Sequence, residues 1–266
     1  MRIFIMGTGN MGRWFAQKLC AEYEVAVYDI VKEKMNSLSG VKRLERVEDV
    51  KEFDPHIVIN AVSLSNILEA FDKLLPYVGN ECIISDIASV KGMLPEYYKK
   101  SRRRFASTHP MFGPTFTDPD NLYDENVIII RESDEEGKVF FKRFYGRLGL
   151  HIHEYSFEEH DETIAYSLSI PFASSMVFAA CMKKQDAPGT TFKRHLDIAE
   201  RLLSEDDHLL AEIMFNPYTI KQIERIEAQL SYLKHIIKDK DYEEMFKFLN
   251  RLRSNIGHDM CSNCSK

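Results

Sequence analysis

The feature that most constrains this chain is a glycine-rich turn near its N-terminus. A short apolar run, Arg2–Met6, leads directly into Gly7-Thr8-Gly9-Asn10-Met11-Gly12, and a helical pattern over Met11–Glu22 follows. In such a unit the first glycine permits the tight turn, the second lets a ligand reach the backbone, and the third lets the helix pack on the strand. The helix N-terminus adds free N–H groups and a partial positive charge. The pattern predicts that a dinucleotide pyrophosphate is bound by Gly7, Thr8, Gly9, Asn10, Met11 and Gly12.

An acidic residue ends the second predicted strand, in Val25-Ala26-Val27-Tyr28-Asp29. A carboxylate at this position accepts hydrogen bonds from both ribose hydroxyls and repels a 2′-phosphate. Asp29 therefore favours NAD as the cofactor. The competing interpretation is that Asp29 caps the following helix, and the nearby Lys32 and Lys34 leave NADP open.

Short apolar runs alternate with helical patterns over residues 1–154. The predicted strands are Arg2–Met6, Glu24–Tyr28, Ile57–Asn60, Cys82–Ser85, Phe105–Thr108, Val127–Ile130 and Leu150–His153. The predicted helices between them are Met11–Glu22, Ser65–Leu75 and Glu135–Leu148. This alternation is typical of crossover units in a largely parallel sheet. We therefore expect an α/β fold, in which residues 1–154 form a Rossmann-like, doubly wound NAD-binding domain.

The remaining residues, 155–266, lack β-rich runs and read as an all-helical domain. Glu158–Met182 is too apolar for a surface helix, so we expect it to be buried at a domain core or a subunit seam. Further helices are predicted over Thr191–Leu203, Tyr218–Asp239 and Tyr242–Arg253. We expect this domain to bind substrate and to form a homodimer.

Composition excludes several classes of function. The net charge of −6 disfavours a nucleic-acid partner, which requires a basic surface. No run approaches the roughly 18 uninterrupted apolar residues of a membrane span, and the apolar start is too short for a signal peptide. We therefore expect a cytoplasmic protein without a membrane partner. His258, Cys261 and Cys264 near the C-terminus lack a complete ligand set, so we expect a frayed end and no metal site.

The best catalytic candidate is a histidine that follows a predicted strand, in Ser107-Thr108-His109-Pro110-Met111-Phe112-Gly113-Pro114. Ligands of such sheets bind at the carboxyl ends of the strands, so His109 should face the cofactor cleft. Ser89, in Ser89-Val90-Lys91-Gly92, follows another strand and is expected to hydrogen-bond His109 or the substrate; alternatively it caps the next helix. Val62 and Ser63 end a third strand, where the dinucleotide should pass between its ribose and its nicotinamide.

Together, the glycine turn, Ser89–Gly92 and His109–Pro114 resemble the prephenate dehydrogenase family of tyrosine biosynthesis. The resemblance implies NAD(P)-dependent oxidation of prephenate to 4-hydroxyphenylpyruvate and CO2 by a homodimer. It implies that His109 is the catalytic histidine and Ser89 the active-site serine. It also implies a substrate-binding arginine in the helical domain, for which Arg201 is the best match and Lys193 and Arg194 are second choices.

The residues agree with that chemistry. Hydride leaves a carbon that bears a hydroxyl, and a neutral histidine can accept the hydroxyl proton. Prephenate carries two carboxylates, and the planar guanidinium of an arginine grips one in a bidentate manner. Without the resemblance, Arg201 reads as a surface ion pair with Asp197 or Glu205 on the same helix.

The chain departs from the family where many members carry Ser-His-x-Pro-His. Here the stretch is Leu168-Ser169-Ile170-Pro171-Phe172, so only Ser169 remains as a substrate contact. This leaves arogenate, the aminated relative of prephenate, as an alternative substrate. His160 and Asp161 are interpreted as helix-start and interdomain residues, not as catalysts. Two further alternatives are another two-domain dehydrogenase of a small acid or imine, and a non-catalytic NAD-sensing protein.

Overall fold

The computed structural model describes residues 1–113 and 121–257. Contacts divide the chain into two compact units, Met1–Thr219 and Ile220–Lys266, and each is described by itself. The predicted domain boundary between residues 154 and 155 differs from this division, because it lies where the β-rich sequence pattern ends and not where contacts become sparse. That boundary stays a prediction.

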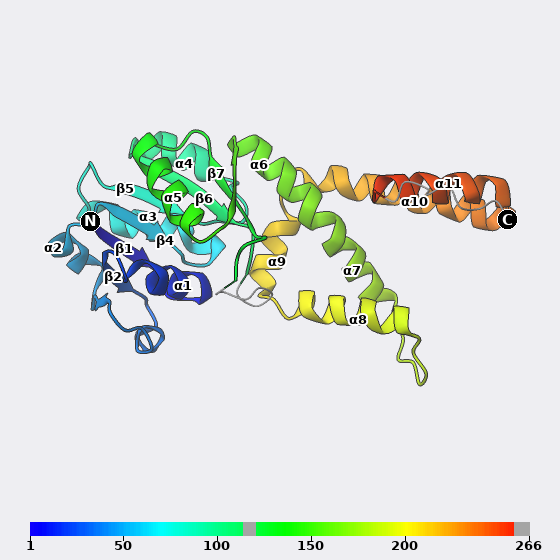
Figure 1. Cartoon of the computed structure of the whole chain (residues 1–266), viewed down its shortest axis with the longest axis horizontal. Coiled ribbons are helices and arrows are strands. Elements are labelled where there is room, and N and C mark those ends of the chain that lie inside the picture. Colours follow the sequence, from blue (N-terminus) through cyan, green and yellow to red (C-terminus); the bar gives the residue numbers. More distant parts are fainter. Residues whose placement is uncertain (114–120, 258–266) are drawn as a thin grey trace. The chain divides into compact units, whose positions relative to one another are not determined.

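The first unit is built on one eight-stranded sheet with the order β3-β2-β1-β4-β5-β6-β7-β8 (Figure 1). The strands are β1 (Arg2–Met6), β2 (Glu24–Tyr28), β3 (Lys42–Arg43), β4 (Ile57–Asn60), β5 (Ile83–Asp86), β6 (Phe105–Pro110), β7 (Asn126–Ile130) and β8 (His151–Tyr155). Neighbouring strands are parallel except β6 and β7. The chain reverses its direction of winding between β1 and β4, which is where ligands of doubly wound sheets bind. The predicted α/β fold is confirmed.

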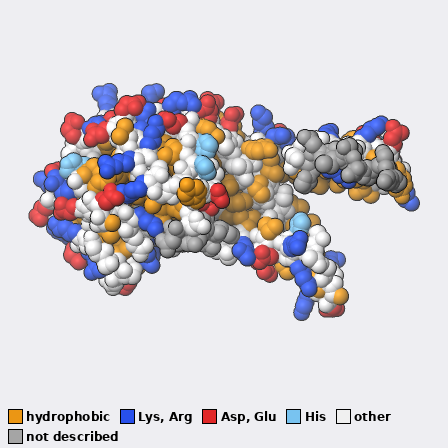
Figure 2. Space-filling view, viewed as in Figure 1, with side chains coloured by type: hydrophobic (Ala, Val, Ile, Leu, Met, Phe, Trp, Pro, Cys, Tyr) orange, Lys and Arg blue, Asp and Glu red, His pale blue; other side chains and the backbone are white. Residues whose placement is uncertain are grey.

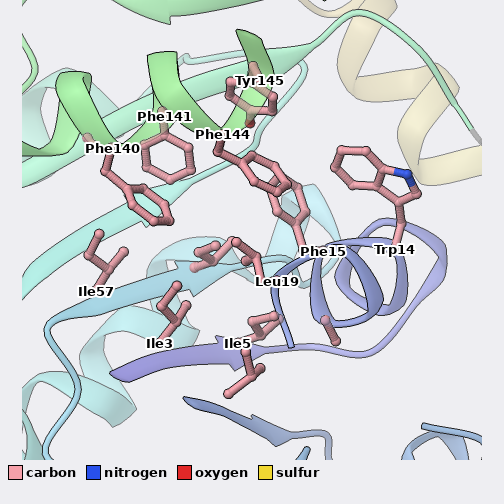
Figure 3. Close-up of a cluster of buried hydrophobic side chains, with 14 of the residues drawn as sticks. Ile3, Ile5, Trp14, Phe15, Leu19, Ile57, Phe140, Phe141, Phe144 and Tyr145 are labelled. Carbon is pink, nitrogen blue, oxygen red and sulfur yellow. The ribbon is translucent and has the colours of Figure 1, made fainter. Parts of the chain in front are cut away.

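Helices cover both faces of the sheet because its strands alternate their side chains. Ile3 and Ile5 pack against α1 (Asn10–Leu19) and α5 (Glu135–Arg147), and Figure 3 shows this aromatic-rich core. Phe4 and Met6 pack on the opposite face. That face is covered by α2 (Val50–Phe53), α3 (Ile67–Leu74) and α4 (Leu94–Ser101). Each fully buried apolar side chain contributes about 1.5–3 kcal/mol, so the two cores hold the strand ends rigidly.

One continuous helical run follows the sheet. It consists of α6 (Phe157–Ile164), a π-helical turn (Ala165–Ser169) and α7 (Ile170–Cys181). The start of the run is buried at His160, Asp161 and Ile164, but Ala173 is the sole buried residue of α7. The expectation that this whole stretch is buried in a domain core is therefore wrong for α7. Burial in a subunit seam stays a prediction.

The exposed apolar surface of α7 is visible in Figure 2. Phe157–Cys181 has a mean hydropathy of 1.6 in its most apolar window, of which 22% is buried, so by length and composition it would suffice to cross a membrane. A single helix of this kind is weak evidence, because helices that pack against protein pass the same test. The first unit is completed by α8 (Thr190–Leu203) and α9 (Asp207–Met214).

The second unit is a helical hairpin. It consists of α10 (Thr219–Asp239), whose first residue belongs to the first unit, and α11 (Tyr242–Asn255). Tyr232 packs edge-on against Phe248, and Arg251 lies over both rings. These contacts and the preceding helices confirm the predicted all-helical C-terminal part.

Candidate active site

The glycine turn between β1 and α1 is fixed by close backbone packing. Gly7 has φ +92°, and a Cβ there would lie 2.8 Å from the backbone of Ala61 and Val62. A Cβ on Gly12 would lie 1.9 Å from the carbonyl oxygen of Gly7. A Cβ on Gly9 would meet no described atom within 4 Å, which leaves open space at the helix N-terminus. The three glycines thus differ in their surroundings as expected for a glycine turn of this kind, and pyrophosphate binding by them stays a prediction.

Asp29 follows β2 and binds the glycine turn directly. Its Oδ2 accepts hydrogen bonds from the Thr8 backbone N–H at 2.7 Å and from the Thr8 hydroxyl at 3.0 Å. Its Oδ1 accepts one from the Val31 backbone N–H at 2.9 Å. The competing interpretation that Asp29 caps the following helix is wrong, because the N-cap of the short helix Lys32–Met35 is Val31 and no side chain caps it. Oδ1 of Asp29 keeps an acceptor site for a ribose hydroxyl.

Residues after β4 lie beside the glycine turn. The backbone N–H of Ala61 bonds the carbonyl of Met6 at 2.8 Å, which joins the ends of β1 and β4. Val62 is half-buried and Ser63 is exposed, and the Ser63 hydroxyl accepts a hydrogen bond from Asn66 at 2.7 Å. These two residues follow β4 at the same end of the strands as Gly7 and Asp29. Their contact with a dinucleotide stays a prediction.

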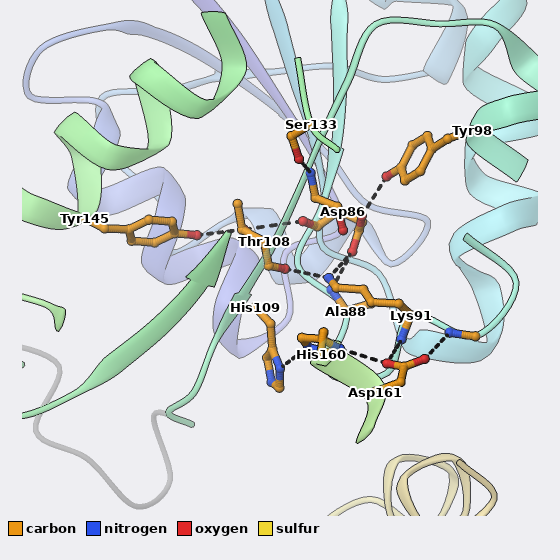
Figure 4. A network of polar contacts seen from close by, with 12 residues as sticks. Asp86, Ala88, Lys91, Tyr98, Thr108, His109, Ser133, Tyr145, His160 and Asp161 are labelled. Atoms are coloured by element: carbon orange, nitrogen blue, oxygen red, sulfur yellow. Dashed lines mark hydrogen bonds and ion pairs between the residues drawn. The ribbon is translucent and has the colours of Figure 1, made fainter. Parts of the chain in front are cut away.

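His109 lies at the carboxyl end of β6, in the same edge of the sheet. Its side chain is 6% exposed, and its Nδ1 is 2.9 Å from Nε2 of His160 on α6. The Nδ1 of His160 is in turn 2.8 Å from Oδ1 of Asp161. Figure 4 shows this row of His109, His160 and Asp161. His160 and Asp161 lie in the first turns of α6, as their helix-start interpretation expects, and the row links them to His109.

A buried ion pair adjoins this row. The Lys91 ammonium donates to Asp86 Oδ1 at 2.7 Å and to the Thr108 carbonyl at 2.8 Å. Asp86 also accepts from the Tyr98 hydroxyl at 2.6 Å. Lys91 and Asp86 are fully buried, so the pair fixes the residue before His109 from the neighbouring strand β5.

The electrostatics keep the histidines neutral. Burial lowers the pKa of His109 well below 6.5, and the charges of His160 and Lys91 act in the same direction. Burial also lowers the pKa of His160, although Asp161 opposes it. Burial raises the pKa of Asp161, but hydrogen bonds from His160 and from the backbone of Lys91 and Gly92 outweigh it, so the pKa is lowered overall. At neutral pH the row therefore contains two neutral imidazoles and a carboxylate.

Ser89 is in the loop after β5 and is half-buried. Within residues 1–113 and 121–257 no hydrogen bond joins it to His109, so that predicted contact is not present in this structure. The alternative that Ser89 caps the next helix is wrong, because the N-cap of α4 is Met93.

The predicted substrate residues lie in different surroundings. The Arg201 side chain on α8 is 64% exposed and pairs with Asp197 at 3.2 Å, as its surface interpretation expects. Lys193 and Arg194 on the same helix are exposed. Ser169 is fully buried in the π-helical turn, and its hydroxyl bonds that of Thr219 at 2.7 Å. Substrate binding by these residues stays a prediction.

Within the described residues, no group of three or more His, Cys, Asp or Glu side chains is arranged so that it could hold a metal ion. The C-terminal His258, Cys261 and Cys264 lie outside the described residues, as does Pro114.

A family model described as "Prephenate dehydrogenase, nucleotide-binding domain" matches residues 15–147. This is half of the chain, and it includes Ser89 and His109. The chain belongs to the prephenate dehydrogenase family. The predicted resemblance is thus confirmed.

Similarity to known proteins covers nearly the whole chain, beyond residues 15–147. A "probable arogenate/prephenate dehydrogenase" of Methanocaldococcus jannaschii is 26% identical over 276 residues, covering 96% of this chain and 60% of that relative. The chain therefore spans about three fifths of that relative's length. Prephenate dehydrogenase of Aquifex aeolicus, in complex with hydroxyphenyl propionate and NAD+, has a similar fold: TM-score 0.83, 23% identity, 97% of this chain and 98% of that one. Arogenate dehydrogenase of Synechocystis gives TM-score 0.76, 17% identity, 97% of this chain and 99% of that one.

The link from His109 through His160 to Asp161 could not be predicted from the sequence pattern. His160 and Asp161 are 51 and 52 residues after His109, so no local spacing joins them to it. Their signal is a histidine–aspartate pair in the first turns of a helix, and only the packing of α6 on the sheet brings it to His109.

Proposed function

We propose that this protein oxidises prephenate with NAD+, releasing CO2 and 4-hydroxyphenylpyruvate. The observation that carries the proposal is the buried, neutral imidazole of His109 at the carboxyl end of β6, in a member of the prephenate dehydrogenase family. A neutral imidazole accepts a proton at neutral pH, as a general base at the substrate hydroxyl must.

The residues of the glycine turn fit NAD+. Gly7 and Gly12 allow the tight packing of β1, α1 and β4, and the open space at Gly9 suits a pyrophosphate at the helix N-terminus. Asp29 at the end of β2 favours a free ribose hydroxyl over a 2′-phosphate. When bound, NAD+ supplies a nicotinamide ring that accepts the hydride. The nucleotide-binding description of the family and the NAD+ complex of the similar Aquifex aeolicus structure support this cofactor.

His109 has the central role in the reaction. It accepts the proton of the C4 hydroxyl as that carbon gives up hydride, so the carbon–oxygen bond becomes a ketone. The carbon–carbon bond to the ring carboxylate then breaks, its electron pair enters the ring, and CO2 leaves as the ring becomes aromatic. The ketone oxygen becomes a phenolate, which takes the proton back from His109 to give the phenol of the product. Ser89 is proposed to orient the substrate hydroxyl. Arg201 is proposed to bind a substrate carboxylate, for which it would exchange its exposed pair with Asp197.

The test is turnover. Purified protein with prephenate and NAD+ is expected to form NADH, and His109→Asn should lower kcat about 10³-fold while the affinity for NAD+ is kept. His153→Asn, on the exposed side of β8, is the matched control and should turn over like the parent. Wild-type rates in His109→Asn would overturn the assignment of the base.

Arogenate is the second candidate substrate. The family's paired histidines are replaced by Leu168-Ser169-Ile170-Pro171-Phe172, and the Methanocaldococcus jannaschii relative carries both substrate names. The two substrates share the ring chemistry and differ in a keto or amino group on the side chain. Initial rates for prephenate and arogenate, each with NAD+ and NADP+, separate them and also test Asp29.

We further propose that the protein is a cytoplasmic homodimer joined through its helical part. The exposed apolar residues of α7 support this, because a second copy would remove them from water. The protein is expected to remain in the soluble fraction without detergent and to give the mass of a dimer by light scattering at micromolar concentration. A monomer, or a protein that requires detergent, would contradict the proposal.

A further inference from the structure

The row of side chains behind His109 has a defined hydrogen-bond direction. It begins at Asp161, whose Oδ1 accepts from the Lys91 backbone N–H at 2.9 Å and whose Oδ2 accepts from the Gly92 backbone N–H at 3.0 Å. The Asp161 carbonyl accepts from the Asn216 side chain at 2.9 Å. The carboxylate is thus held from the loop after β5, and its backbone from the segment after α9.

The chemistry of each group fixes the next one. An ionised carboxylate only accepts hydrogen bonds, so His160 must donate from Nδ1, 2.8 Å away. A neutral imidazole that donates from one nitrogen accepts at the other, so Nε2 of His160 accepts. His109 must then donate from Nδ1 across the 2.9 Å contact, which leaves the lone pair on its Nε2.

We infer that His160 and Asp161 are positioning residues. They hold His109 in the tautomer that carries its proton on Nδ1 and keeps the lone pair of Nε2 available to accept a proton. The tautomer itself follows from the hydrogen bonds of a neutral His160 beside an ionised Asp161, whereas its use in catalysis rests on the proposed function. His160 acts through His109 and is not itself assigned contact with substrate.

Burial and the Lys91 charge oppose protonation of His109, so the charge balance of the whole cluster matters when its Nε2 takes up a proton. The charged groups that face the two imidazoles are Asp86 on β5, Lys91 in the following loop and Asp161 on α6. With both imidazoles neutral these three groups sum to one negative charge, all of it buried or nearly so. When Nε2 of His109 accepts a proton, the cluster becomes neutral. The positive charge is then stabilised through His160 by Asp161, which needs no reorganisation because its backbone donors are fixed.

Nuclear magnetic resonance tests the tautomer without any activity. Protonated and unprotonated ring nitrogens give well-separated ¹⁵N signals, and the chain has nine histidines, so the His109 signals are assigned by their loss in His109→Asn. Neutral His109 is expected to carry its proton on Nδ1 in the wild-type protein. A proton on Nε2 would overturn the inference.

Steady-state kinetics test whether the enzyme uses this His109 tautomer in catalysis. Leucine at position 160 cannot accept a hydrogen bond, whereas glutamine offers an amide oxygen in place of Nε2. We expect His160→Leu to lower kcat about 100-fold with KM for NAD+ changed less than about 3-fold, and His160→Gln to retain at least about ten times more kcat than His160→Leu. In the spectrum, His160→Leu should give a mixture of both His109 tautomers. His153→Gln, whose Nε2 contacts Asn126, is the matched control and should match the parent.

These outcomes separate the inference from the proposed function. If the wild type shows the Nδ1–H tautomer but turns over neither prephenate nor arogenate, the proposed function fails and the positioning of His109 stands. If the enzyme is active and the two His160 variants have equal kcat, the positioning role is overturned. If His160→Leu does not fold, the wild-type spectrum and His160→Gln still decide.

Discussion

His109 and Arg201 differ in how firmly the surrounding residues hold their side chains. His109 is 6% exposed, and its row of partners ends on backbone N–H groups. Arg201 is 64% exposed on the surface of α8, and its ion pair is with Asp197 one turn away. The proposed base is therefore preorganised, whereas the proposed substrate anchor is held only by an exchangeable surface pair.

This difference has an energetic meaning. Rearranging a buried, fully hydrogen-bonded network costs several kcal/mol, because it leaves polar groups unpaired. An exposed pair at i,i+4 spacing contributes about 0.3–0.5 kcal/mol, which a bidentate carboxylate easily exceeds. Substitutions at the buried sheet edge that holds His109 should therefore have larger effects than substitutions at the exposed Arg201–Asp197 pair.

Apart from the loss of turnover in His109→Asn, the largest effect is expected at the glycine turn, which is held rigidly by buried packing as His109 is. Gly12→Ala places a Cβ 1.9 Å from the Gly7 carbonyl oxygen, so α1 must move away from β1. We expect the dissociation constant for NAD+ to rise more than about 100-fold and the free energy of unfolding to fall by about 1–3 kcal/mol. Titration calorimetry and urea denaturation measure the two quantities.

Two other glycines serve as controls for that variant. Gly9→Ala adds a Cβ that meets no described atom within 4 Å, so it should weaken NAD+ binding while lowering stability by less than about 1 kcal/mol. Gly146→Ala on α5 adds a Cβ at an ordinary 3.8 Å from Ile152 and should leave NAD+ binding unchanged. Equal NAD+ affinity in all three variants would mean that the turn is not the cofactor site.

A smaller effect is expected at the exchangeable anchor. Arg201→Gln removes the guanidinium and should raise KM for prephenate about 10- to 100-fold, equivalent to about 1.4–2.7 kcal/mol, with KM for NAD+ and stability unchanged. Asp197→Asn breaks the same ion pair from its other side. It should lower KM slightly or leave it unchanged, because Arg201 is then free to bind substrate.

Steady-state kinetics distinguish the two interpretations of Arg201. If Arg201→Gln and Asp197→Asn have the same small effect, Arg201 is only a surface ion pair. The same measurement on Lys193→Gln and Arg194→Gln then shows whether either neighbour is the anchor instead.

The fold was largely predictable from the sequence. Arg2–Met6, Glu24–Tyr28 and Ile57–Asn60 match the observed strands residue for residue, because buried parallel strands are short apolar runs between breakers. The two-residue strand Lys42–Arg43 was missed because it is charged and lies at the sheet edge. The helix Asp207–Met214 was missed because eight residues give too little periodicity.

The candidate site was predictable only where local sequence determines it. The glycine turn and the position of His109 at a strand end follow from neighbouring residues. The contact of His109 with His160, and the burial of Ser169 against Thr219, depend on tertiary packing that no spacing in the sequence reveals. Exposure of α7 could not be read from its apolar composition either, because composition predicts burial without saying whether the same chain supplies it.

The smallest effect is expected in the pH dependence of the free energy of unfolding, and it arises from the buried His109. Burial lowers the pKa of His109 below 6.5, so as the pH falls under 6.5 the unfolded chain binds a proton that the folded chain does not. The free energy of unfolding therefore falls with decreasing pH, by at most about 1.4 kcal/mol per pH unit for this group. Urea denaturation at pH 7.5, 6.5 and 5.5 should give a shallower fall for His109→Asn than for the wild type, by about 1 kcal/mol at pH 5.5.

His153→Gln, altered on the exposed β8, should keep the wild-type slope. Parallel curves for the wild type and His109→Asn would mean that His109 accepts its proton as readily folded as unfolded, and the contrast with the exposed Arg201 region would lose its electrostatic basis.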